Sequence, residues 1–154
     1  MRRGVGTSER DIRAAGLRCT AQRIAVLDTL RARRHHYRAD ELSSIVAERL
    51  GAVSTQAVYD SLSALVGVGL ARRIEPAGSA ALFEAGCGDN HHHLVCRECG
   101  VVVDIPCLAG AAPCLEIADD RGFVVDEAEI TFWGLCPTCQ AAAHQPEPTL
   151  ESKE

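Results

Sequence analysis

Residues 91–100 read His-His-His-Leu-Val-Cys-Arg-Glu-Cys-Gly, and this stretch is the most informative part of the chain. It contains one Cys-x-x-Cys pair, Cys96 and Cys99, and a second pair, Cys136 and Cys139, follows much later. Four thiolates in two such pairs are typical of a closed tetrahedral zinc site, which stabilises structure rather than catalysing a reaction. Zinc bound there would close a long loop between strands. The spacing therefore predicts one structural Zn2+ per subunit.

Two other interpretations of these cysteines fit less well. A thioredoxin-like redox site has a single pair at the start of a helix. A zinc deaminase requires a His-x-Glu motif before Pro-Cys-x-x-Cys, whereas here Pro137 follows Cys136 and the chain contains no His-x-Glu.

The charge of the chain differs between its two halves. The 154 residues carry a formal net charge of −5, but residues 1–83, with 13 arginines, carry +5 and residues 84–154 carry −10. A basic half before an acidic half indicates a nucleic-acid partner for the basic half, although a solvated arginine-rich surface explains the same charge. No apolar run approaches the roughly 20 residues of a membrane span, and no apolar stretch follows the basic start. We therefore expect a cytoplasmic protein with reduced thiols and no membrane partner.

Residues 1–83 have the pattern of short helices followed by a β-hairpin. Thr20 and Ser54 are placed as N-caps before apolar residues at helical spacing, and a Pro-Ala-Gly turn separates two strand-like pieces. This order is typical of a winged helix-turn-helix. We expect helices over residues 8–15, 20–33, 39–50 and 54–66 and strands over residues 70–74 and 80–83.

The remainder is rich in predicted strands. Residues 84–90, with two glycines and an Asp-Asn pair, are predicted to form a hinge. Residues 91–140 are predicted to form a small α/β metal-binding domain, and residues 141–154 a disordered tail. Within that domain we expect strands over residues 94–96, 101–105 and 124–133 and a helix within residues 110–120. The predicted fold class is therefore α+β, with the winged helix-turn-helix before the small α/β domain.

His91 and His93 are ligands that the zinc does not need. In an extended segment, residues two apart point to the same side, as chelation requires. His36, Glu84 and Asp104 add further imidazole and carboxylate groups, and this donor set suits iron, manganese, zinc or nickel rather than copper(I) or calcium. A surface histidine run that binds nothing specific is the alternative at this point.

Taken together, these motifs resemble the ferric uptake regulator (Fur) family of metal-responsive repressors over residues 8–139. The resemblance rests on Gly16-Leu17-Arg18-x-Thr20-x-x-Arg23, His35-His36, Ala57-Val58-Tyr59-x-x-Leu62, Phe83-Glu84, residues 91–100 and Cys136-x-x-Cys139. It implies a homodimer in which residues 91–140 form the dimerisation domain, and a regulatory metal site that joins the two domains. Carried over position by position, that site binds Fe2+ or Mn2+, with Zn2+ as a further candidate, and consists of His36, Glu84, His91, His93 and Asp104.

For DNA contacts we expect the helix over residues 54–66 to enter the major groove. Gln56 can make bidentate contacts with adenine, and Thr55 and Tyr59 can contact thymine methyl groups or phosphates. Packing of a half-buried tyrosine is the alternative role of Tyr59. Asp60 occupies a position that is often arginine in the family.

Two arginines outside this helix are also expected to contact DNA. By resemblance, Arg18 reaches an AT-rich minor groove. Arg23 would bind a phosphate, and a surface ion pair is the alternative role for it.

The resemblance also favours a response to oxidant. Asp104 occupies a position that is commonly Glu in iron-uptake members and Asp in the peroxide-sensing branch. Residues 89–93, with two cysteines that follow them, look like actinobacterial members linked to catalase-peroxidase genes. The resemblance implies that bound Fe2+ reacts with peroxide and that His36 or His91 is oxidised, which releases the metal.

A second route to oxidant sensing uses thiols. Cys107 and Cys114 are not needed for zinc, and they could form a reversible disulfide if they are exposed and low in pKa. Cys19 and Cys87 are further candidates, although a free buried cysteine is usually inert.

We therefore predict a metal-dependent transcriptional repressor that binds an AT-rich inverted repeat in double-stranded DNA as a homodimer and is released by oxidant. An iron- or zinc-homeostasis repressor without peroxide sensing is the alternative. A zinc enzyme that uses His91 and His93 is the alternative from a different class, but such a site needs an open ligand position and a general base, and no motif supplies the base. We accordingly expect no enzyme activity and no small-molecule substrate.

Overall fold

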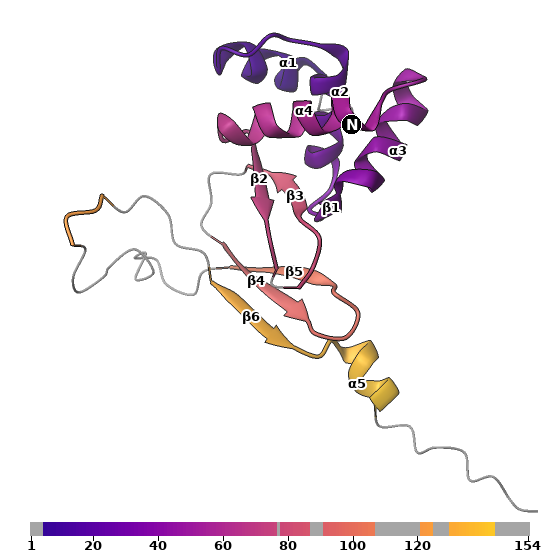
Figure 1. The fold of residues 1–154 in the computed structure, drawn as a ribbon, viewed down its shortest axis with the longest axis vertical. Coiled ribbons are helices and arrows are strands. Elements are labelled where there is room, and N and C mark those ends of the chain that lie inside the picture. Colours follow the sequence, from indigo (N-terminus) through magenta and orange to yellow (C-terminus); the bar gives the residue numbers. More distant parts are fainter. Residues whose placement is uncertain (1–4, 77, 87–90, 107–120, 125–129, 144–154) are drawn as a thin grey trace, which may run out of the picture. The chain divides into compact units, whose positions relative to one another are not determined.

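The computed structural model describes residues 5–76, 78–86, 91–106, 121–124 and 130–143, and the chain divides into two compact units. The first unit ends at residue 89 and the second begins at residue 90, and the colours of Figure 1 follow the sequence through both. The fold class is α+β as predicted, with a winged helix-turn-helix before a small sheet domain. Among the described helices, none combines the length and the apolar character that a membrane crossing requires.

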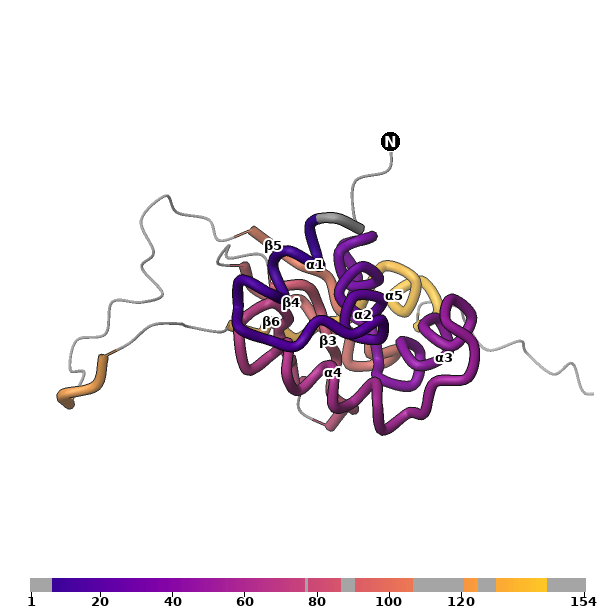
Figure 2. The backbone as a smooth tube through the Cα atoms, turned by 90° about the horizontal axis from the view of Figure 1, so that it is seen from above, coloured from indigo at the N-terminus to yellow at the C-terminus, as the bar shows by residue number. Residues whose placement is uncertain are grey.

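Four helices build the first unit: α1 (Val5–Ala14), α2 (Ala21–Ala32), α3 (Ala39–Leu50) and α4 (Thr55–Gly67). α2 packs against the other three, and Figure 2 shows it among them. Apolar side chains at helical spacing meet in a common core and are almost completely buried; they include Ile12, Leu27, Leu30, Leu42, Leu62 and Leu65. Their burial stabilises the unit, and the apolar stripes of the sequence predicted α2, α3 and α4 correctly. The predicted helix over residues 8–15 is also present, but α1 begins three residues earlier, at Val5.

The starts of α2 and α4 are set by the predicted caps. Oγ1 of Thr20 accepts a hydrogen bond from the backbone N–H of Arg23 at 3.3 Å, and Oγ of Ser54 accepts one from Ala57 at 3.2 Å. Each bond satisfies an N–H group that has no partner inside the helix. Because α4 starts immediately after Ser54, Thr55 lies at its exposed first turn.

Three short strands complete the first unit: β1 (Tyr37–Arg38), β2 (Ala71–Ile74) and β3 (Leu82–Ala85). They form an antiparallel sheet in the order β1-β3-β2. β1 was not predicted, because two residues are too few for an alternating pattern. The predicted hinge began at residue 84, but Glu84 belongs to β3, because it pairs with Arg72 of β2.

A second three-stranded sheet forms the described part of the second unit. β4 (His91–Cys96) lies at its centre, with β5 (Val102–Pro106) antiparallel and β6 (Thr131–Gly134) parallel to it. The predicted strand over residues 124–133 began too early, because Val124 is 95% exposed and lies in no strand. The predicted helix within residues 110–120 lies outside the described residues.

A short helix that was not predicted, α5 (Pro137–Ala143), follows β6. Pro137 is its first residue, where the fixed φ of proline suits a helix start and an N–H group is not needed. Residues 141–143 belong to α5 rather than to the predicted disordered tail, and residues 144–154 lie outside the described residues.

Candidate metal centres and nucleic-acid interface

The four predicted zinc ligands lie together in the second unit. Cys96 ends β4, Cys99 follows in a turn, Cys136 precedes α5 and Cys139 lies near its start. The parallel pairing of β4 with β6 places Cys96 opposite Gly134, and the backbone N–H of Cys136 donates to Cys96 Sγ at 3.3 Å. Strand pairing therefore joins two cysteine pairs that are far apart in the sequence.

The separations among these sulfurs fit a tetrahedral zinc ion. The four Sγ atoms all lie within 4.8 Å of one another, and those of Cys99 and Cys136 are 3.7 Å apart. A tetrahedron with Zn–S bonds of about 2.3 Å has edges of about 3.8 Å. Gly100 closes the first turn with a φ of 71°, and its N–H donates to the Cys96 carbonyl at 3.0 Å. The residues present therefore fit a structural zinc.

The thiols of the metal-free cluster differ in acidity. The backbone N–H groups of Cys99 and Cys136 donate to the Cys96 sulfur and lower the pKa of Cys96 to about 6. The Cys136 side chain accepts a hydrogen bond from Cys139, which favours the protonated thiol and raises the pKa of Cys139 to about 12. One ligand is therefore prepared as a thiolate and another must lose a proton to the solvent when it binds a metal.

Zinc binding at about pH 7.5 is expected to release fewer than four protons per ion. The pH lies above the Cys96 pKa of about 6, so this thiol is already ionised. It lies below the Cys139 pKa of about 12, so that proton must leave and the apparent zinc affinity rises with pH. Calorimetry in buffers of different ionisation enthalpy counts the protons. A release of four, or an affinity that does not depend on pH, would contradict this assignment.

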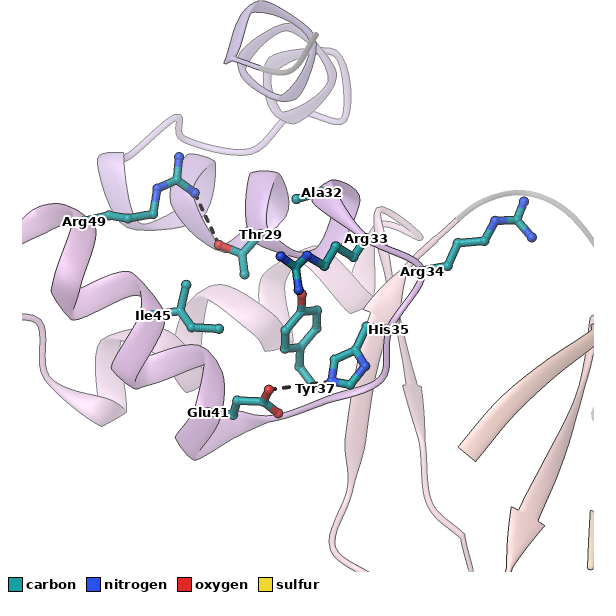
Figure 3. A pocket seen from close by; sticks show the side chains of 9 residues that line it. All are labelled: Thr29, Ala32, Arg33, Arg34, His35, Tyr37, Glu41, Ile45 and Arg49. Carbon is teal, nitrogen blue, oxygen red and sulfur yellow. Dashed lines mark hydrogen bonds and ion pairs between the residues drawn. The ribbon is translucent and has the colours of Figure 1, made fainter. Parts of the chain in front are cut away.

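Two adjacent histidines in the first unit have different surroundings. The His36 side chain is 6% exposed, and its Nε2 lies 3.3 Å from Oε2 of Glu84. His35 is 53% exposed, its Nε2 lies 3.6 Å from Glu41, and its ring meets that of Tyr37 edge-on at 4.5 Å. Figure 3 shows His35, Glu41 and Tyr37 lining a cavity of about 620 Å³ that none of the predicted metal ligands lines. The structure thus distinguishes the buried His36 from its exposed neighbour.

Glu84 is positioned by the hairpin. It pairs with Arg72 across β2 and β3, and Nη1 of Arg72 lies 3.6 Å from Glu84 Oε1. Sequence reasoning missed Arg72, because the register of a hairpin depends on its turn, and the composition of the strands does not reveal it. The first unit thus brings together one imidazole and one carboxylate of the predicted regulatory site.

The other three predicted ligands of the regulatory site meet in the second unit. His91 and His93 point to one face of β4, and their ring centroids are 5.0 Å apart. Asp104 of β5 pairs with His93, and its Oδ1 lies 3.9 Å from Nε2 of each histidine. His91 is 8% exposed and His93 1%, so these histidines do not form the surface run that was the alternative. Buried imidazoles beside a carboxylate fit iron, manganese or zinc.

The thiols proposed for redox sensing are only partly described. Cys107, Cys114 and Cys87 lie outside the described residues. Cys19 is half-buried and packs against the apolar core of the first unit.

The residues predicted to enter the major groove lie on one exposed helix. Thr55, Gln56 and Tyr59 are exposed on α4, and Tyr59 retains 45% of its accessible surface. This exposure leaves the Tyr59 side chain accessible for a contact with DNA, and its role there stays a prediction. Nε2 of Gln56 donates a hydrogen bond to Oδ1 of Asp60 at 2.8 Å, a contact that sequence reasoning missed although the spacing of four residues could have indicated it.

One of the two arginines expected to contact DNA is hydrogen-bonded to the backbone of the other. Nη1 of Arg23 donates to the backbone carbonyl of Arg18 at 2.7 Å, and the Arg18 side chain is exposed. This contact holds the guanidinium of Arg23 against the backbone of the segment that carries Arg18.

Comparison with known proteins identifies the family. The model of the ferric uptake regulator family matches residues 14–133. The transcriptional regulator FurA of Mycobacterium tuberculosis is 50% identical over 128 residues, which cover 83% of this chain and 86% of that protein. The peroxide-responsive repressor PerR of Staphylococcus saprophyticus is 29% identical over 131 residues, which cover 84% of this chain and 86% of that protein.

Solved structures share the fold. The ferric uptake regulator from Pseudomonas aeruginosa with manganese matches with a TM-score of 0.71 and 27% identity, over 84% of this chain and 98% of that one. A zinc uptake regulator complexed with zinc and DNA matches with a TM-score of 0.65 and 20% identity, over 92% and 95% of the two chains. Family members are transcriptional regulators and not enzymes, which removes the zinc-enzyme alternative. The chain belongs to the ferric uptake regulator family of metal-responsive transcriptional regulators.

Proposed function

We propose that this protein is a cytoplasmic, metal-dependent repressor that binds an AT-rich inverted repeat of double-stranded DNA as a homodimer and is released by oxidant. The observation that carries the proposal is the presence of buried imidazoles beside carboxylates in both units: His36 with Glu84, and His91 and His93 with Asp104. Such groups are costly to bury unless they are paired or coordinate a metal. Their donor set suits Fe2+ or Mn2+, and Zn2+ as well.

The proposed regulatory site uses all five of these residues. A divalent ion supplies the positive charge that lets two carboxylates and three imidazoles converge. His36 and Glu84 belong to the unit that contains α4, and the other three ligands belong to the second unit. Ligands from both units that share one coordination sphere restrain each unit relative to the other. In a symmetric dimer this restraint sets the separation of the two α4 helices.

The separation of the α4 helices determines which DNA the dimer can bind. Two recognition helices must match half-sites about one helical turn or a multiple of it apart. Metal favours the DNA-competent state of the dimer to the extent that it binds this state more tightly than the state that cannot bind the operator. A zinc uptake regulator that shares this fold forms a complex with zinc and DNA, which is consistent with DNA binding by this chain.

Exposed apolar side chains on the second unit support the homodimer. Leu94 of β4 pairs with Val103 of β5 and with Phe132 of β6, so the three side chains form a row across the sheet. This row lies on the face of β4 opposite to His93. Leu94, Val103 and Phe132 are 43%, 50% and 47% exposed. An exposed apolar row of this kind is typical of an interface, and we assign a second copy of the chain to it.

Replacing Leu94 with glutamate is expected to dissociate the dimer. Central residues of an apolar interface can each contribute about 2 kcal/mol or more to the free energy of binding. A charge at such a position removes this contribution, so the dimer Kd should rise by at least about thirtyfold. Sedimentation equilibrium measures this change. Leu50→Glu is the matched control, because Leu50 of α3 is also 43% exposed and lies in the other unit. A Leu94→Glu protein that remains dimeric at wild-type concentrations would remove this surface from the interface.

The chain is similar both to the transcriptional regulator FurA and to a peroxide-responsive repressor, and this similarity bears on whether it responds to oxidant. The chain resembles FurA more than PerR in identity, while Asp104 is the feature that favours peroxide sensing. Bound Fe2+ supplies one-electron chemistry with peroxide. An oxidised His36 or His91 would donate less strongly, and the remaining ligands would then hold the metal too weakly for DNA binding. The alternative, metal homeostasis without peroxide sensing, uses the same residues.

The test compares DNA binding and chemical modification in one sample. The dimer is loaded with Fe2+ under anaerobic conditions, treated with limited peroxide, assayed on DNA and mapped by peptide mass. We expect loss of metal-dependent binding together with a gain of one oxygen on His36 or His91, and no such loss in a Mn2+-loaded control. Loss of two hydrogens that link Cys107 with Cys114 would transfer sensing to thiols. Unchanged binding at low peroxide would favour metal homeostasis.

A further inference from the structure

Helix α4 carries one charged side chain, and that charge is negative. Its sequence contains Asp60 and neither lysine nor arginine. Asp60 is exposed, as are Thr55, Gln56 and Tyr59 on the same helix. DNA phosphates repel a carboxylate, so a contact of Asp60 with DNA has to involve the edge of a base. The charge of α4 therefore suits base recognition and opposes backbone binding.

Gln56 and Asp60 are one helical turn apart and form a pair. Nε2 of Gln56 donates to Oδ1 of Asp60 at 2.8 Å, as side chains four residues apart on one helix face can do. An ionised carboxylate accepts hydrogen bonds and cannot donate one. The Gln56 amide must therefore turn its nitrogen toward Asp60, and its Oε1 is held on the other side. A lone glutamine could present either end of its amide to a base, and Asp60 removes that choice.

We propose that Gln56 and Asp60 act as one specificity-determining pair, which selects a base that offers an exocyclic amino group in the major groove. Oε1 of Gln56 and the second carboxylate oxygen of Asp60 are acceptors, and N6 of adenine and N4 of cytosine are donors on that groove edge. Where adenine and cytosine have these amino groups, guanine and thymine present the acceptors O6 and O4, which these oxygens repel. Asp60 is thus a positioning residue for Gln56. This inference rests on the proposed DNA binding by α4.

The experiment first needs an operator. The Mn2+-loaded wild-type dimer selects duplexes from a random pool, and every base pair of the selected half-site is then substituted in turn. Affinities are measured for the wild type, Asp60→Asn, Gln56→Ala and the double variant. Glu48→Gln is the control for charge, because Glu48 is an exposed acid on α3 and its replacement changes the net charge by the same amount.

In the wild type, guanine or thymine at one half-site position should weaken binding by about 5- to 150-fold relative to adenine or cytosine. Asp60→Asn should flatten the preference at that position and keep it elsewhere, while overall affinity rises because a negative charge is lost. Gln56→Ala should reduce the base preference at the same position. The double variant should lose no more of that preference than the single variant with the larger loss. Glu48→Gln should leave the base profile unchanged.

Two results would overturn the pairing. Asp60→Asn could keep the full base preference, or Gln56→Ala and Asp60→Asn could relax different positions with additive effects. In both cases the wild type still selects specific DNA, so the proposed function stands. A wild-type dimer that selects no duplex when loaded with Mn2+ would instead overturn both the proposed function and this inference.

Discussion

Replacing Cys96 with serine is expected to abolish zinc binding and the cooperative unfolding of the second unit. The zinc content should fall from about one ion per subunit to nearly none, because a serine hydroxyl does not replace a thiolate in a closed tetrahedral site. Metal analysis of the purified protein and far-UV circular dichroism melting measure the two effects. Of the substitutions proposed for this protein, this one should change the structure most.

The size of this effect follows from the few buried apolar side chains in the described part of the second unit. The apolar cluster of buried side chains belongs to the first unit, and among the described residues of the second unit Val95 and Cys96 are the buried apolar ones. The described part of this unit therefore buries little apolar surface to offset its conformational entropy. Zinc that binds the folded state and not the unfolded state supplies the missing stability.

Cys19→Ser is the matched control for the loss of a thiol. Cys19 belongs to the first unit and the four zinc ligands belong to the second, and both substitutions replace a sulfur with an oxygen. This variant should keep one zinc per subunit and the melting transition of the second unit. A Cys96→Ser protein that also keeps its zinc and its transition would show that the cluster does not hold the structural metal.

Replacing His93 with alanine is expected to reduce metal-activated DNA binding by about 100-fold or more at limiting Mn2+. His93 is 1% exposed and lies 3.9 Å from Asp104, so its imidazole would be a direct ligand of the regulatory ion. Loss even of a group that only orients a ligand costs about 10- to 100-fold in metal affinity. By linkage, weaker metal binding appears as weaker DNA binding until metal is in excess. Fluorescence anisotropy with labelled operator across a Mn2+ titration measures this shift.

His35→Ala controls for the general loss of a histidine. His35 is exposed and pairs with Glu41, so its removal should leave the Mn2+ titration close to that of the wild type. Zinc content and melting of both variants should also match the wild type, because neither residue belongs to the cysteine cluster. If His93→Ala follows the wild-type Mn2+ curve, then His93 is not a ligand of the regulatory metal and the proposed site must be abandoned.

Local patterns account for what could be predicted from the sequence. The caps at Thr20 and Ser54 and the apolar spacing behind them act within a few residues, so the helices could be predicted without knowledge of the tertiary structure. The Cys-x-x-Cys spacing is equally local, and by itself it limits the chemistry to a thiolate-bound metal. Short elements escaped prediction: β1 has two residues, and α5 has seven with no buried side chain to mark one face.

Features that depend on register could be decided only by the tertiary structure. The fold class, the helices of the first unit and the four thiolates could be predicted from residue types alone, because each follows from short, fixed spacing. The tertiary structure decided that His36 is buried while His35 is exposed, that Glu84 faces Arg72 and that Asp104 meets His91 and His93. Strand pairing brings Glu84 to Arg72 and Asp104 to the histidines of β4, and a shift of one residue would turn each of these side chains to the opposite face.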